Sequence, residues 1–101
     1  MTKGYVVVTE EIFDPVALTT YAAKAAATIR QAGGRVLVSD PAPHALEGSW
    51  HGSKTVILEF DSPEAARGWY ESSGYQAVVG LRHAATDSRA VLLRGVEALR
   101  A

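Results

Sequence analysis

The strongest constraint on the fold is a phrase that occurs twice in the chain. VVVTEEIFDP near the N-terminus and TVILEFDSP in the middle both consist of an apolar strand, acidic residues and a helix start marked by proline. Asp14 and Ser62 can accept the free amide protons of a first helical turn, and the proline after each of them sacrifices no hydrogen bond there. The duplication therefore predicts two strand–helix units built on the same plan.

Four apolar runs have the length and the β-branched character of strands. They are Tyr5–Thr9, Arg35–Ser39, Thr55–Phe60 and Ala90–Val96. The first helix is expected from Asp14 to Gly33-Gly34 and the second from Ser62 to a break at Ser72-Ser73-Gly74, after which a further helix runs from Tyr75 to Ala85.

The polar stretches between these elements are expected to be turns and loops. His44–Gly48 either resumes the second strand or extends its edge, because Asp40-Pro41-Ala42-Pro43 interrupts it. Asp87-Ser88 is predicted to be an exit turn and Glu97–Ala101 a short tail. The order is then β-α-β-β-α-β with a split second helix. With right-handed crossovers it predicts an α+β, ferredoxin-like fold with an antiparallel four-stranded sheet, in a single domain over residues 1–101.

All four strands are apolar on both faces, whereas a sheet with helices on one side normally alternates apolar and polar residues. The runs are Val6-Val7-Val8, Val36-Leu37-Val38, Val56-Ile57-Leu58 and Val91-Leu92-Leu93. The face without helices would be a large exposed apolar patch, which usually marks an interface. We therefore expect a two-fold homodimer that pairs through this sheet face.

Composition excludes several classes of function. The net charge is −1 and the ten Lys and Arg residues are scattered, so neither nucleic acid nor a membrane surface is an expected partner. Without cysteine there is no disulfide or thiolate site, and without a secretory signal the chain is expected to be soluble and cytoplasmic. No nucleotide-binding or serine-hydrolase motif is present, so no cofactor is expected.

Arg82 is the residue that most suggests a site, because it shares an apolar helix face with Tyr75. A buried arginine needs a partner, and Glu59 is the only charge within the TVILEF strand. One interpretation is an Arg82–Glu59 ion pair that braces the helix against the sheet. The other is an arginine fork that binds a substrate carboxylate, with Glu59 orienting it or acting as a base.

Aromatic residues could form the wall of a ligand pocket near the helix break. Tyr70 and Tyr75 carry hydroxyls that need partners when buried, and with Trp50 they could enclose a small molecule between the split helix and the sheet. Trp69 is interpreted as core packing. His51 is the best candidate for a general base among the histidines, with a solvated loop position as the alternative. The three histidines lack the spacing of metal ligands, so no metal site is expected.

A set of ordered motifs resembles the family called domain of unknown function 1330 and spans nearly the whole chain. These motifs are Lys3-Gly4-Tyr5, Gly33-Gly34-Arg35, Leu46-Glu47-Gly48-x-Trp50, Ile57-x-Glu59-Phe60, Ala65-Ala66-Arg67-x-Trp69-Tyr70, Tyr75-Gln76 and Leu81-Arg82. The resemblance implies a dimeric α/β barrel. Members of that superfamily include cofactor-free monooxygenases, lactone isomerases, dehydratases, haem proteins and proteins that only bind ligands, so the fold by itself does not select a reaction.

Three hypotheses follow. The first is a cofactor-independent enzyme, such as an isomerase, decarboxylase or monooxygenase-like protein, that moves a proton on a small carboxylated or aromatic metabolite. The second is a non-catalytic ligand-binding or accessory dimer that uses the same pocket. The third is a scaffold without a cavity, in which Arg82 and Glu59 form only a structural pair.

Overall fold

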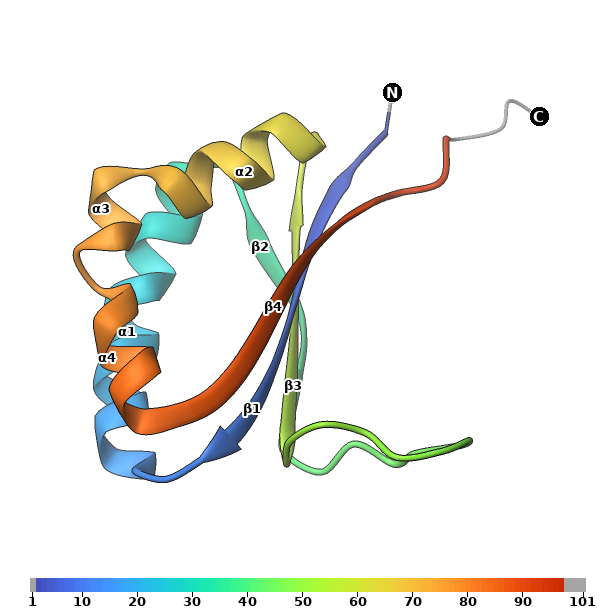
Figure 1. Cartoon of the computed structure of the whole chain (residues 1–101). Helices are drawn as coiled ribbons and strands as arrows, with labels where there is room; N and C mark the ends of the chain where they lie inside the picture. The colour runs from blue at the N-terminus through green and yellow to red at the C-terminus, as the bar shows by residue number, and fades with distance from the viewer. Residues whose placement is uncertain (1, 98–101) are drawn as a thin grey trace.

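The computed structural model describes residues 2–97, and its elements follow the order that the duplicated phrase predicts (Figure 1). The strands are β1 (Gly4–Ile12), β2 (Arg35–Asp40), β3 (Lys54–Phe60) and β4 (Thr86–Arg94). The helices are α1 (Pro15–Gln31), α2 (Pro63–Glu71), α3 (Ser73–Gln76) and α4 (Val79–Ala85). The strands form one antiparallel sheet in the order β2-β3-β1-β4, which confirms the ferredoxin-like arrangement.

Both predicted helix starts are confirmed. The side chain of Asp14 accepts a hydrogen bond from the Ala17 amide at 3.0 Å, and Ser62 accepts one from the Ala65 amide at 3.0 Å. Each cap satisfies one of the amide groups that a first helical turn leaves free. In both strand–helix units, therefore, a side-chain cap just before the proline sets where the helix begins.

Two predictions about the region after α2 are wrong. The expected helix from Tyr75 to Ala85 is two helices, because α3 ends at Gln76 and α4 begins at Val79. Asp87-Ser88 is not a turn, since β4 begins at Thr86 and these two residues pair with the end of β1. The long β1 provides ladder partners for polar residues that have no strand propensity of their own.

The segment between β2 and β3 is a loop, so the prediction that His44–Gly48 continues the second strand is also wrong. Gly48 and Gly52 have positive φ angles of 68° and 82°, which belong to turns and not to a ladder. The loop projects from the side of the sheet opposite to the helices (Figure 1). Of the predicted tail, residues 98–101 lie outside the described residues.

The helices cover one face of the sheet (Figure 1). The side chains of the strands divide between the two faces, because successive residues of a strand point to opposite sides. Val6, Val8, Leu58 and Phe60 point toward the helices and are buried in the core with Trp69. α2 packs directly over β1, β3 and β4, whereas α1 packs mainly against α3 and α4. α1 is therefore held by other helices, and this leaves room between it and the sheet.

The opposite face of the sheet, which we call the open face, has an apolar centre. Its side chains come from alternate positions of all four strands and include Val7, Val38, Ile57, Val91 and Leu93. Val91 is 52% exposed and Leu93 48% exposed. The expectation that the strands are apolar on both faces is confirmed.

Within residues 2–97, none of the helices combines the length and the hydropathy that crossing a membrane would require.

Candidate functional site

A cavity of about 150 Å³ lies between α1 and the sheet. Its walls are aliphatic and come from one side of α1 and from the helix-facing positions of the sheet. They include Val8, Leu18, Ala22, Ala25, Ala26, Ile29, Val36, Val56 and Leu58. Three of the five α1 residues in this wall are alanines, and their short side chains leave the space unfilled.

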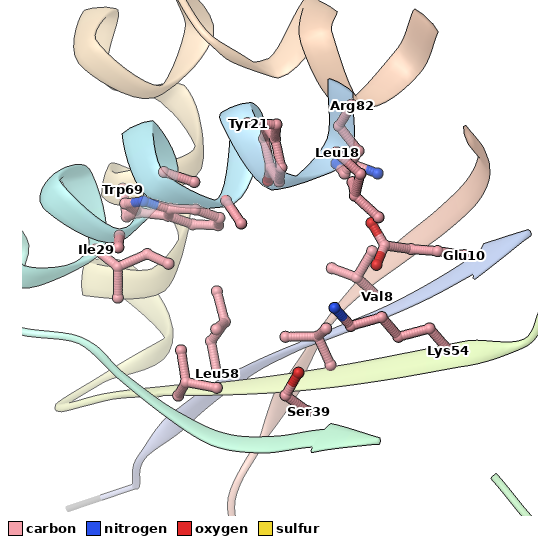
Figure 2. Close-up of a pocket in the computed structure, with 15 residues that line it drawn as sticks. Val8, Glu10, Leu18, Tyr21, Ile29, Ser39, Lys54, Leu58, Trp69 and Arg82 are labelled. Carbon is pink, nitrogen blue, oxygen red and sulfur yellow. The ribbon is translucent and has the colours of Figure 1, made fainter. Parts of the chain in front are cut away.

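The two ends of the cavity differ in polarity (Figure 2). Trp69 and Ile29 close one end, whereas Glu10, Lys54 and Arg82 meet at the other. In Figure 2 the carboxyl group of Glu10 lies between the ammonium group of Lys54 and the side chain of Arg82. This charged end of an apolar cavity is the candidate site.

Glu10 reaches the site because it occupies a helix-facing position on β1, directly opposite Lys54 on β3. It is 3% exposed, and its side chain has no hydrogen bond or ion pair within the described residues. Burial raises the pKa of Glu10, while the charges of Lys54 and Arg82 act in the opposite direction. A carboxyl group with a raised pKa can exchange a proton closer to neutral pH than an exposed glutamate can.

Arg82 enters the cavity from α4 and is 3% exposed. One terminal nitrogen donates to the hydroxyl of Ser88, and the guanidinium lies beside the phenols of Tyr21 and Tyr75. Its Nε is buried and has no hydrogen-bond partner among the described residues. A buried guanidinium N–H without a partner is costly, and an anionic ligand would satisfy it.

Two tyrosines extend the polar end. The hydroxyls of Tyr21 on α1 and Tyr75 on α3 are 2.7 Å apart, and Tyr75 is fully buried against Trp69 with ring centroids at 4.1 Å. Ser72 caps α3 by accepting from the Tyr75 amide at 3.2 Å, which fixes the helix break that aims Tyr75 inward. Burial, followed by the proximity of Tyr75, raises the pKa of Tyr21, so its phenol stays protonated and can donate a hydrogen bond.

The predicted pair between Arg82 and Glu59 is wrong. Glu59 accepts hydrogen bonds from the hydroxyl of Tyr5 at 2.8 Å and from Arg35 at 2.6 Å, and all three residues belong to the open face. Tyr5 and then Arg35 lower the pKa of Glu59. Its neighbours on β3, Leu58 and Phe60, are the ones that face the helices, because successive strand residues point to opposite faces.

His51 and Trp50 also belong to the open face and not to the cavity. Nδ1 of His51 lies 2.6 Å from the hydroxyl of Thr9, and Nε2 lies 3.6 Å from Asp87. The indole of Trp50 donates to Thr55 at 2.8 Å and is 53% exposed. The loop that carries both residues lies on the side of the sheet opposite to the helices (Figure 1), whereas Arg82 lies on the helix side.

Tyr70 lies close to Tyr75, with ring centroids at 5.6 Å, but it is 37% exposed and does not line the cavity. Its ring instead borders a second pocket, of about 230 Å³, over β4. The predicted pocket of Trp50, Tyr70 and Tyr75 is therefore wrong, because the structure brings only Tyr75 to the polar end. The indole of Trp69 is core packing as expected, with its N–H donated to Thr28 at 3.0 Å.

Sequence reasoning missed Glu10, Lys54 and Tyr21. A signal for Glu10 was present, because it continues the period of Val6 and Val8 on one face of the first strand. Lys54 joins the site through the β1–β3 register, which the sequence does not specify. No group of histidine, aspartate and glutamate side chains within residues 2–97 is arranged to hold a metal ion.

Comparison with known proteins places the chain among proteins whose functions are mostly unassigned. The family "Domain of unknown function (DUF1330)" matches residues 3–96, and no curated protein matches the sequence. A protein of unknown function from Rhodopseudomonas palustris is similar in structure, with a TM-score of 0.76 and 20% identity over 95% of this chain and 84% of that one.

Two further solved structures share the fold at lower identity. SnoaB, a cofactor-independent oxygenase from Streptomyces nogalater, has a TM-score of 0.64 and 17% identity, covering 97% of this chain and 95% of its own. A dimeric ferredoxin-like protein of unknown function from Thermobifida fusca has a TM-score of 0.54 and 10% identity, covering 91% and 90%. These likenesses support the fold and leave the reaction open.

Proposed function

The chain belongs to the DUF1330 family, and we propose that it binds a small carboxylated molecule in the cavity beside α1 and moves a proton on it without a cofactor. One observation carries the proposal: the same cavity holds a buried arginine N–H and a buried carboxyl group, and neither has a hydrogen-bond partner within the described residues. Such groups are expensive to bury unless a ligand completes them.

The chemistry assigns a role to each residue. Arg82 and Lys54 attract the anionic group of the ligand, and Glu10 takes a proton from a carbon next to a carbonyl group. The electrons of the broken C–H bond move onto the carbonyl oxygen, where the Tyr21 phenol and Arg82 stabilise the resulting enolate. When Glu10 returns the proton to a different atom, the net reaction is an isomerisation.

The structural likeness to a cofactor-independent oxygenase supports the part of the proposal that concerns the cofactor. SnoaB shows that a chain of this fold can perform chemistry without a cofactor. A monooxygenase-like reaction or a decarboxylation also develops negative charge on an oxygen, and the same donors would stabilise it. Proton transfer by Glu10 distinguishes the isomerase-type reaction proposed here from a decarboxylation.

Solvent deuterium exchange into phenylpyruvate tests the proposal, because this probe combines a carboxylate with an acidic C–H next to a carbonyl. We expect the wild-type chain to accelerate exchange and Glu10→Gln to slow it by about 100-fold or more, the range typical of a general base. Glu59→Gln is the matched control and should retain the wild-type rate. Equal losses in both variants, or exchange that survives Glu10→Gln, would refute the role of Glu10.

Binding separates the enzyme from the non-catalytic ligand-binding protein that the sequence left open. Arg82→Lys keeps the charge but removes the planar fork, so it should weaken binding of the probe if Arg82 holds the carboxylate. Circular dichroism confirms that the variant is folded. Binding that depends on Arg82 without any exchange in the wild-type chain would assign the protein to the ligand-binding class.

We also propose that two copies pair through the open face. The exposed Val91 and Leu93 support this, as does the described dimeric state of the Thermobifida protein of the same fold. Light scattering at micromolar concentration should give the mass of two chains, and Val91→Arg should give that of one. Val16→Arg, at a 78% exposed position on α1, is the control. A monomeric wild-type chain would refute the pairing.

A further inference from the structure

The cavity is small for a site that binds organic molecules. Its volume of about 150 Å³ is close to that of an engineered apolar cavity that encloses benzene. Sites for drug-sized ligands usually measure about 300–1,000 Å³. The space beside α1 therefore has room for one six-membered ring or a short branched chain and not for fused rings.

The distribution of polar groups restricts the ligand further. From Trp69 and Ile29 to Val8 the walls are apolar apart from the hydroxyl of Ser39 on β2, and the charged groups meet at one end only (Figure 2). A ligand that fits both ends has an apolar body and a single polar head. A sugar or another molecule with hydroxyls around its whole surface would leave those hydroxyls without partners against the aliphatic walls.

The charges at the polar end favour one negative charge on the ligand. Lys54 and Arg82 carry two positive charges, and ionised Glu10 carries one negative charge, so one positive charge remains to be balanced. A monoanion balances it in a site of low dielectric, where uncompensated charge is costly. A second carboxylate would have to lie near Glu10 or in the apolar end.

The entrance to the cavity lies between α1 and the edge strand β2. Ala22 on α1 is exposed and Ala26 half-buried, and across the gap Val36 is 52% exposed. β2 is an edge strand of the sheet and is exposed along its whole length. The alanines of α1 thus keep the entrance open, and a larger side chain at position 26 would close it.

From these observations we infer that the ligand is a monocarboxylate whose apolar part is a single ring or a short branched chain, that Lys54 is its second anchor beside Arg82, and that Ala26 limits its size. The inference rests on the proposed function and names the substrate class for the same site. It predicts selectivity by size and by charge, which the proposed function alone does not require.

Calorimetric titration with four related probes tests it. Benzoate should bind at least about 10-fold more tightly than benzamide, which lacks the charge, than phthalate, which has a second carboxylate, and than 2-naphthoate, which has a second ring. Lys54→Met should weaken benzoate binding by about 10-fold or more, in line with the loss of a charge-assisted contact. Ala26→Leu should abolish binding, whereas Ala23→Leu, an exposed α1 position outside the cavity wall, should leave it unchanged.

The outcomes separate this inference from the proposed function. Binding that requires Arg82 but is as tight for 2-naphthoate or benzamide as for benzoate overturns the substrate class and leaves the site in place. Ala26→Leu with unchanged benzoate affinity overturns the assigned entrance. If the wild-type chain binds no carboxylate probe of any size, including phenylpyruvate, the proposed function itself fails.

Discussion

Glu10→Gln should change how the stability of the folded chain depends on pH. In the folded state burial raises the pKa of Glu10 above its ordinary value of 4.5, so this carboxyl keeps its proton to a higher pH than in the unfolded chain. Between the unfolded and the folded pKa, the unfolded state has lost the proton and the folded state retains it. The stabilisation is therefore fully present at low pH and is lost as the pH rises through the folded pKa.

The structure sets the sign of the effect, and proton linkage sets its largest slope. Glu10 is 3% exposed without a hydrogen bond from the described residues, and Lys54 and Arg82 offset only part of the cost of its burial. Glutamine has the same shape and does not ionise. The unfolding free energy of Glu10→Gln should therefore rise relative to wild type by up to about 1.4 kcal/mol per pH unit above the unfolded pKa, and then level off. For a chain of this size each 1 kcal/mol corresponds to about 4–8 °C in Tm.

Urea unfolding followed by far-UV circular dichroism from pH 4.5 to 8.5 measures this difference. A difference in unfolding free energy that is the same at every pH would reflect only the buried amide of Glu10→Gln. The test is therefore whether the difference between Glu10→Gln and wild type changes with pH. Glu11→Gln, at the exposed neighbouring position, is the control because it removes a carboxylate that is not buried. If the difference between Glu10→Gln and wild type stays constant across the range, the buried carboxyl does not cost stability and the reasoning fails.

Glu59→Gln should behave in the opposite way, because Tyr5 and Arg35 lower the pKa of Glu59. The stabilisation by Glu59 is present above the ordinary carboxyl pKa and is lost at acid pH. Urea unfolding should therefore show that Glu59→Gln is less stable than wild type at pH 7, by an amount that shrinks as the pH falls. Tyr75→Phe removes the hydrogen bond to Tyr21 and should cost about 1 kcal/mol by urea unfolding. Gly4→Ala should cost about 1–3 kcal/mol, because a Cβ there overlaps the backbone where α2 begins. Gly68→Ala, whose Cβ would meet only open space within α2, should gain about 0.5–1 kcal/mol by the same measurement, and equal stability of the two glycine variants would contradict this packing.

Most of the fold could be predicted because it depends on local signals. The Asp14 and Ser62 caps, the proline after each cap and the apolar strands lie within a few residues of the structure that they specify. The errors occur where a distant partner decides the outcome. Asp87-Ser88 is in a strand because β1 extends far enough to pair with it, and no local pattern shows that.

The site was predicted in part. Arg82 and Tyr75 could be found because a charge and a phenol on an apolar helix face are conspicuous in sequence. Glu10 and Lys54 become neighbours only through the β1–β3 register, and Tyr21 meets Tyr75 only because α1 packs against α3. No local pattern shows these contacts, because Glu10 and Lys54 are separated by 44 positions in the sequence and Tyr21 and Tyr75 by 54 positions.

The sequence by itself determined the strand–helix units, their order and the two apolar faces of the sheet, because these follow from caps and periodicity along a short stretch of chain. Only the tertiary structure decided which strand residues face the helices. Alternating apolar and polar residues along β3 would have shown that Glu59 points away from Arg82. In this chain Val56, Ile57 and Leu58 place apolar side chains on both faces of β3, so the middle of this strand carries no signal that distinguishes the cavity side from the open face.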